Sequence, residues 1–123
     1  MEKNTKKILI IENEKMVAHA LEIELIHAGF KTHTVFSGED GIELLKKESF
    51  SLILLDLIMP KMDGFMVLAI LKVKKIKTPV IVLTNINQES DMEHAKEFGA
   101  KDFFIKSDTS IEKIVLRAKK LLK

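Results

Sequence analysis

Short apolar runs alternate with longer amphipathic stretches along the chain, and the alternation occurs five times. Three of the runs, 8–11, 52–55 and 79–83, contain no charged residue, which is typical of strands buried on both faces of a sheet. Segments 31–36 and 101–105 are predicted as the second and fifth strands, the former at a sheet edge because its side chains alternate between the two faces.

Helices are predicted between and after these runs. The first follows 12–14 and ends at Gly29, because glycine commonly terminates helices, and the others span 39–48, 63–74, 89–98 and 111–122. Parallel strands need crossover connections, and right-handed crossovers place helices on both faces of the sheet. The pattern therefore predicts an α/β fold in which five helices cover a doubly wound, five-stranded parallel sheet.

Composition restricts the setting in which such a protein works. The length of 123 residues suits a single domain over 1–123, and we expect no separate output domain. The absence of Cys excludes thiol catalysis and thiolate metal sites. No apolar run approaches the roughly 18 residues that cross a bilayer, so we expect a cytoplasmic protein without a membrane partner.

The charge distribution argues against direct nucleic-acid binding. The net charge is only +2, and the 20 basic residues are spread along the chain rather than gathered in one stripe. Trp and Tyr are absent, which removes the side chains that most often stack on bases. Solvated helix faces explain the basic residues better.

Chemically useful side chains follow four of the five predicted strands. Glu12 and Asn13 follow the first strand, Asp56 the third, Thr84 the fourth and Lys106 the fifth. Parallel strands of this type bind ligands at their carboxyl ends, so these groups are expected to converge. Acidic oxygens suit a hard dication such as Mg²⁺, and the ammonium and hydroxyl groups suit phosphoryl oxygens. The set predicts phosphoryl transfer onto a carboxylate.

Asp56 is the candidate nucleophile of this set. It follows an unbroken apolar run and precedes Met59 and Pro60, so its backbone is held rigidly while its side chain faces the crevice at the strand ends. The alternative interpretation is an aspartate that only opens a turn. Polar side chains at three other strand ends are expected to converge on the same crevice, which favours the interpretation of Asp56 as a nucleophile.

These motifs resemble the receiver domain of two-component response regulators, especially single-domain members like the chemotaxis regulator. The resemblance runs from about Lys6 to Leu122, and its most specific part is LLDLIMPKMDGF. It implies a flavodoxin-like sheet with strand order 2-1-3-4-5. The DLIMP, VIVLTN and DFFIK segments place the family's phospho-accepting aspartate at Asp56, its switch hydroxyl at Thr84 and its lysine at Lys106.

The resemblance also implies a mode of action. Asp56 would accept a phosphoryl group from a sensor histidine kinase, a phosphotransfer protein or a small phosphodonor, with Mg²⁺ held by Glu12, Asn13, Asp56 and the backbone carbonyl of Ile58. The chain would promote only its own phosphorylation and dephosphorylation and would not otherwise be an enzyme. A downstream protein target would read the face made by the fourth helix, fifth strand and last helix.

Phe103 is implied as the aromatic residue whose inward or outward position reports the state of Thr84. The competing interpretation is an ordinary core residue, because Phe103 and Phe104 point to opposite faces of their strand and one of them must be less buried. The two interpretations remain open at this stage.

Three residues depart from the family pattern. Asn13 stands where a second acidic residue is usual, so one negative charge is missing beside the expected cation. The attraction between two unit charges about 4 Å apart is worth a few kcal/mol at an effective dielectric constant near 20, and its loss predicts weaker Mg²⁺ binding. Glu12 and Glu14 could partly substitute for it. Asn85 replaces a small residue beside Thr84 and narrows access to Asp56, and Ser107 replaces a proline after Lys106.

Ile58 and Ile86 are implied to flank the phosphoryl group where water approaches. Both are branched and apolar, so neither can hydrogen-bond an attacking water, and slow self-dephosphorylation is expected. The alternative is that both side chains lie on the surface and leave the rate unchanged.

Other functions account for the motifs less well. A flavin or nucleotide binder would need Ser, Thr and Gly after the first strand, where Glu12 and Glu14 repel phosphate. A phosphatase of the haloacid dehalogenase type would need an aspartate at Ile58. The main alternative is a receiver-like module that is not phosphorylated and acts only by binding proteins, which the neutral Asn13 favours.

Overall fold

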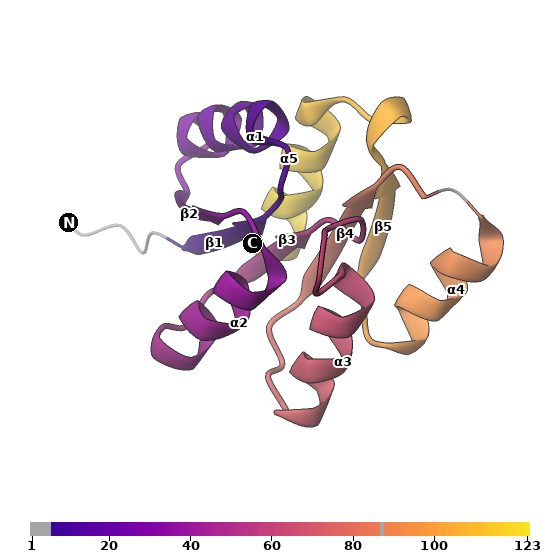
Figure 1. Ribbon diagram of the computed structural model, residues 1–123. Coiled ribbons are helices and arrows are strands. Elements are labelled where there is room, and N and C mark those ends of the chain that lie inside the picture. The colour runs from indigo at the N-terminus through magenta and orange to yellow at the C-terminus, as the bar shows by residue number, and fades with distance from the viewer. Residues whose placement is uncertain (1–5, 87) are drawn as a thin grey trace.

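Five parallel strands form the centre of the fold (Figure 1). A computed structural model describes residues 6–86 and 88–123. The strands are β1 (Lys7–Ile11), β2 (Lys31–Val35), β3 (Leu52–Leu55), β4 (Val80–Thr84) and β5 (Asp102–Ile105). They lie side by side in the order β2-β1-β3-β4-β5, so the strand order implied by the resemblance is confirmed. Strands β1 and β3 therefore neighbour each other, and their carboxyl ends meet at the switch in strand order.

Five α-helices and one short 3₁₀ turn accompany the strands in the described residues. They are α1 (Lys15–His27), α2 (Gly38–Lys47), α3 (Gly64–Val73), α4 (Glu89–Glu97), η1 (Lys106–Asp108) and α5 (Ile111–Leu121). The 3₁₀ turn was not predicted. The predicted helices are confirmed with ends that differ by one or two residues; in α3, for example, Asp63 was predicted as the first helical residue and is the cap just outside the helix.

The two faces of the sheet are covered by different helices, as a doubly wound fold requires (Figure 1). Alternate strand residues point to opposite faces, so each central strand contributes to two hydrophobic cores. One core joins the sheet to α2, α3 and α4 through residues such as Ile42, Val67 and Ala95. The other joins it to α1 and α5 through residues such as Leu21 and Ile114. Rigid packing on both faces fixes the strand ends that carry the polar residues.

The loop from Asp56 to α3 returns closely onto the end of β3. The Asp63 side chain caps α3 by accepting a hydrogen bond from the Met66 N–H at 2.9 Å. The Gly64 N–H donates to the Leu57 carbonyl at 3.0 Å. A Cβ atom on Gly64 would lie 2.5 Å from the Asp56 carbonyl oxygen, so only glycine allows this approach.

No helix within residues 6–86 and 88–123 is long and apolar enough to span a membrane. All four histidines are exposed.

Candidate functional site

Asp56 lies directly after β3 and is almost completely buried, with 3% of its surface exposed. Its backbone N–H donates to the Ile11 carbonyl at 3.0 Å, which continues the pairing of β3 with β1 beyond the strand end. Its Oδ1 accepts a hydrogen bond from the Ile58 N–H at 3.1 Å. These bonds fix the backbone and one oxygen, and the carboxylate borders a crevice of about 150 Å³.

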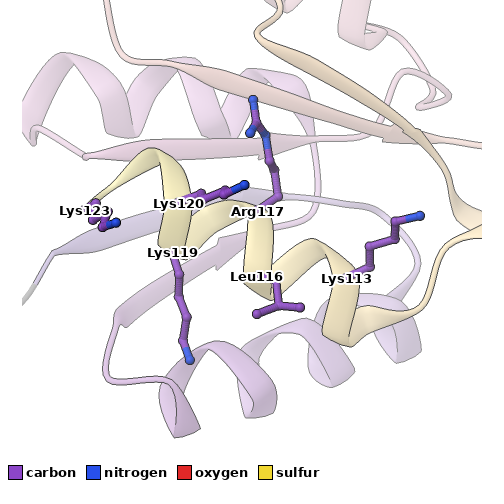
Figure 2. Close-up of a pocket in the computed structure, with 6 residues that line it drawn as sticks. All are labelled: Lys113, Leu116, Arg117, Lys119, Lys120 and Lys123. Carbon is purple, nitrogen blue, oxygen red and sulfur yellow. The ribbon is translucent and has the colours of Figure 1, made fainter.

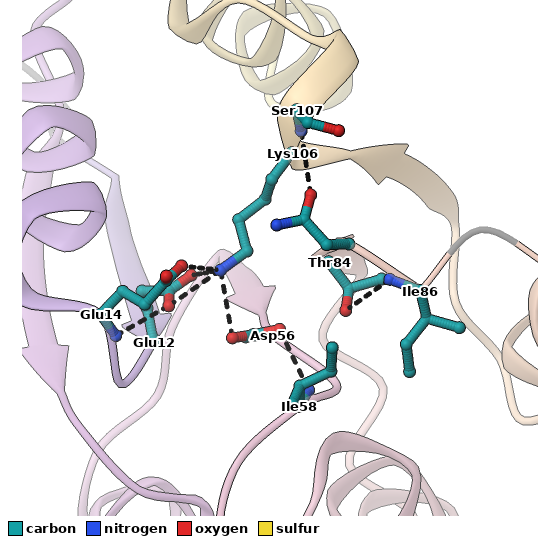
Figure 3. A network of polar contacts seen from close by, with 9 residues as sticks. Glu12, Glu14, Asp56, Ile58, Thr84, Ile86, Lys106 and Ser107 are labelled. Carbon is teal, nitrogen blue, oxygen red and sulfur yellow. Dashed lines mark hydrogen bonds and ion pairs between the residues drawn. The ribbon is translucent and has the colours of Figure 1, made fainter.

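Lys106 joins the acidic residues of the site into one cluster (Figure 3). Its Nζ lies 3.2 Å from Asp56 Oδ2, 3.0 Å from Glu12 Oε1 and 2.6 Å from Glu14 Oε1. The lysine comes from the end of β5, and its partners come from the ends of β1 and β3. The predicted convergence of these strand ends is confirmed.

The electrostatic balance of the cluster favours additional positive charge. Three carboxylates face one ammonium group, and two of them, Glu12 and Asp56, are almost fully buried. Burial and the charge of Asp56 raise the pKa of Glu12 to about 7, although the Glu14 N–H and Lys106 act in the opposite direction. Burial lowers the pKa of Lys106, but hydrogen bonds to Glu14 and Glu12 outweigh burial and hold that pKa above its usual range.

The Asn13 side chain completes the mouth of the crevice. With the amide turned so that its nitrogen faces inward, that nitrogen lies 3.3 Å from Asp56 Oδ2 and 3.2 Å from the Ile58 carbonyl oxygen. The amide, the carboxylate and the carbonyl therefore meet at one point. The Asp56 carboxylate and the Ile58 carbonyl, and the Asn13 amide when its oxygen faces inward, offer the oxygen ligands that suit a hard divalent cation such as Mg²⁺, and the excess of carboxylates around Lys106 favours its charge.

Glu12 is placed differently from the other predicted metal ligands. Its carboxylate accepts hydrogen bonds from Lys106 and from the Glu14 N–H at 2.9 Å, and it is 2% exposed. It is not among the described residues that line the crevice, which are Asn13, Glu14, Asp56, Ile58, Asn85 and Lys106. A metal-binding role for Glu12 stays a prediction, and the structure shows a side chain that holds Lys106 in place.

Thr84 and Phe103 lie on neighbouring strands. Thr84 is fully buried at the end of β4, and its Oγ1 accepts a hydrogen bond from the Ile86 N–H at 3.4 Å. Phe103 of β5 pairs with Val82 of β4 and lines a groove of about 430 Å³ between α4 and β5. Phe103 and Phe104 point to opposite faces, and each is half-buried and packs against the hydrophobic core on its own side of the sheet. The edge position of β5 leaves both faces only partly covered.

The two isoleucines of the predicted water path are not equivalent. Ile58 is 51% exposed and lines the crevice beside Asp56. Ile86 is half-buried and packs against the hydrophobic core under α3 and α4. The structure therefore brings Ile58 to the nucleophile and directs Ile86 partly into the core.

Two contacts at the site were not predicted as such. Glu14 was expected only as a substitute charge for Asn13, whereas its carboxylate makes the shortest contact with Lys106. The Asn85 Oδ1 accepts a hydrogen bond from the Ser107 N–H at 3.0 Å and ties the end of β4 to η1. The only sign of this hydrogen bond in the sequence was that polar residues follow both strands.

The protein-family comparison matches residues 8–119 to the response regulator receiver domain. Among curated proteins, the cell cycle response regulator CtrA of Brucella ovis is 36% identical over 100 residues. The match covers 81% of this chain but only 43% of that relative. The chain thus spans less than half the length of the curated relatives that it matches.

Solved structures with the same fold are numerous. The receiver domain of the Francisella response regulator 1452 has a TM-score of 0.90 and 26% identity, and the match covers 96% of this chain and 97% of that one. The signal receiver domain of a signal transduction histidine kinase from Syntrophus aciditrophicus has a TM-score of 0.86 and 31% identity, and the match covers 96% and 90% of the two chains.

Proposed function

Because the chain belongs to the response regulator receiver domain family, we propose that it is a phosphorylation-driven switch of a two-component system, with Asp56 as the phosphoryl acceptor. One observation carries this proposal most directly. A buried carboxylate at the end of β3 borders an open crevice, and one of its oxygens contacts the ammonium group of Lys106 at 3.2 Å.

The reaction would transfer a phosphoryl group in line. An Asp56 carboxylate oxygen attacks the phosphorus atom, the bond between phosphorus and the donor breaks, and its electron pair leaves with the donor group. An acyl phosphate forms on Asp56. Lys106 neutralises charge on the phosphoryl oxygens, and the Ile58 N–H holds the other carboxylate oxygen in position. Hydrolysis of the acyl phosphate returns the carboxylate and inorganic phosphate.

Mg²⁺ fits the donor set, and Asp56, the Ile58 carbonyl and Asn13 are the groups that would hold it, with Glu14 as a further carboxylate nearby. When bound, the cation supplies charge neutralisation for the transferred phosphoryl group. Asn13 brings no charge, so we expect weaker cation binding than an aspartate would give.

The switch would run from Thr84 to Phe103. Phosphorylation draws the Thr84 hydroxyl from the Ile86 N–H toward the phosphoryl oxygens, and Phe103 turns into the space that it frees. The surroundings of Phe103 support a movable surface. Helix α4 buries only Ala95 fully, and its His94 stacks on Phe65 of α3 with ring centroids 5.0 Å apart.

The readout surface would be the face of α4, β5 and α5. Leu116 of α5 is 62% exposed, and it lines a shallow hollow along the helix together with basic residues, which Figure 2 shows pointing in different directions: Lys113, Arg117, Lys119, Lys120 and Lys123. Arg117 also forms an ion pair with Asp102 of β5, which ties the two elements together. We expect a protein target with acidic residues to bind here, and a histidine kinase or phosphotransfer protein to supply the phosphoryl group.

The experiment is phosphorylation by acetyl phosphate with Mg²⁺, followed by intact mass. Wild type should gain the mass of one phosphoryl group, and hydroxylamine should remove it. Asp56→Asn should gain none. Asp63→Asn is the matched control, because asparagine caps α3 as well as aspartate does, and it should be phosphorylated like wild type. An unmodified wild type would refute the proposal in favour of a module that acts only by binding.

A further inference from the structure

One end of the Asn13 side-chain amide faces two hydrogen-bond acceptors, Asp56 Oδ2 and the Ile58 carbonyl oxygen. With its nitrogen directed inward, the amide donates to Asp56 Oδ2 at 3.3 Å and to the Ile58 carbonyl at 3.2 Å. The opposite orientation would set the Asn13 oxygen against these two acceptors, so we assign the nitrogen inward. The inward NH₂ group satisfies both acceptors with its two hydrogens.

The reversed orientation has a distinct chemical meaning. It would bring three oxygens together, from the Asn13 amide, the Asp56 carboxylate and the Ile58 carbonyl. The Asn13 oxygen would lie 3.3 Å from Asp56 Oδ2 and 3.2 Å from the Ile58 carbonyl oxygen. Neighbouring ligand oxygens around an octahedral Mg²⁺ are about 3.0 Å apart, for metal-to-oxygen distances of 2.0–2.1 Å. Three oxygens at this spacing repel one another without a cation and suit the corner of a Mg²⁺ site with one.

Asn13 is free to change between these orientations. Its side chain is exposed in the turn after β1, so a half rotation of the amide group meets no packed core. The rotation exchanges two donors for one acceptor and leaves the position of the side chain unchanged. No acidic residue can make this exchange, because a carboxylate has no hydrogen to donate at neutral pH.

We propose that Asn13 is a two-position ligand: its NH₂ group closes the site on Asp56 and Ile58 when Mg²⁺ is absent, and its carbonyl turns inward when Mg²⁺ binds. This inference rests on the proposed cation-assisted phosphorylation of Asp56. The amide and the cation compete for the same two oxygens, so the closed position lowers the apparent affinity for Mg²⁺. The same position keeps Asp56 and the Ile58 carbonyl paired without a metal.

The test is NMR of the Asn13 side-chain amide during titration with Mg²⁺ alone. The resonance pair is identified by its loss in Asn13→Asp. In EDTA, wild type should show Asn13 amide protons protected from exchange. Saturation with Mg²⁺ should shift both resonances and remove the protection, in step with the backbone amides of residues 56–58. An Asn13 pair that keeps its shift and protection while residues 56–58 titrate would overturn the inference, as would an unprotected pair in EDTA.

A second measurement uses thermal unfolding. Asn13→Asp should melt lower than wild type in EDTA, because it adds a carboxylate against Asp56, and should gain more from Mg²⁺, with an affinity at least about tenfold tighter. Gln88→Glu is the matched control, an exposed amide changed to a carboxylate, and its Mg²⁺ response should equal that of wild type. Equal melting of Asn13→Asp and wild type in EDTA would overturn the inference.

Intact mass after acetyl phosphate treatment of the same samples separates the two proposals. Phosphorylation together with an unresponsive Asn13 amide overturns the two-position ligand and leaves the proposed function. A responsive amide in a protein that is never phosphorylated overturns the proposed function and leaves the ligand.

Discussion

Gly64→Ala should distort the phosphoryl-acceptor site through the backbone rather than through any side chain of the site. A Cβ atom at this position would lie 2.5 Å from the Asp56 carbonyl oxygen and 2.6 Å from Leu57 Cα. Both contacts are to backbone, so no rotamer change can relieve them. The start of α3 must move away from the segment after β3.

The size of the effect follows from this geometry. An ordinary Cβ contact begins near 3.4 Å, so the methyl group and the carbonyl must separate by about 0.9 Å. Overpacking of this kind costs about 1–3 kcal/mol of unfolding free energy. For a chain of 123 residues, that corresponds to a fall in melting temperature of roughly 4–12 °C. Phosphorylation should slow as well, because a displaced Asp56 no longer meets Lys106 and the phosphorus atom in line.

Thermal unfolding by circular dichroism and acetyl phosphate labelling by intact mass measure the two effects. Gly41→Ala is the matched control, because its Cβ would meet the terminal Cδ1 atom of Ile11 at 2.5 Å, and a flexible side-chain end can move. We expect a smaller loss of stability and normal phosphorylation there. Equal melting temperatures and labelling rates for Gly64→Ala and wild type would refute the close approach of α3 to Asp56.

Three other predictions concern the switch, the lifetime and the pH dependence. Thr84→Ala should still be phosphorylated but should lose the phosphorylation-dependent NMR shift of Phe103, whereas Thr84→Ser should keep it; an unchanged shift in the alanine variant contradicts the switch. Ile58→Asn should speed loss of phosphate several-fold and Ile86→Glu should add less, because only Ile58 lines the crevice; equal decay in wild type and the double variant, followed by intact mass, contradicts this. In EDTA, the free energy of unfolding of wild type, measured with urea, should fall by up to about 3 kcal/mol as pH rises from 4.5 to about 7, because Glu12 binds its proton more tightly in the folded chain than in the unfolded chain. Glu12→Gln should flatten this dependence of the unfolding free energy on pH.

The backbone of this protein could be predicted closely from its sequence. The run 52–55 is β3 residue for residue, and glycines at 29 and 99 follow helix ends with φ of +99° and +100°. These features depend on local properties, namely burial on both faces and the tolerance of glycine for positive φ. The convergence of Asp56 and Lys106 followed from topology, because parallel strand ends share one edge.

The unpredicted features depend on side-chain directions in the loops after the strands. No periodic pattern governs a loop, so the sequence did not show that Glu14 reaches Lys106 or that Asn85 binds the Ser107 N–H. Ile86 turns partly into the core after a bend at Asn85, and it packs there against a cluster drawn from several strands and helices. The hydrogen-bond partners of such loop residues depend on how several strand ends are arranged in the folded chain, so they cannot be predicted from one segment alone.

The central claim is that the Asp56 side chain itself carries the phosphoryl group, and chemical mapping of the modified residue tests it most directly. Wild type is treated with acetyl phosphate and Mg²⁺, the acyl phosphate is reduced with borohydride, and the peptides are sequenced by mass spectrometry. Reduction converts a phosphorylated aspartate to homoserine, and we predict homoserine at position 56. Homoserine at position 63, a reduced glutamate at 12 or 14, or unmodified peptides throughout would contradict the account.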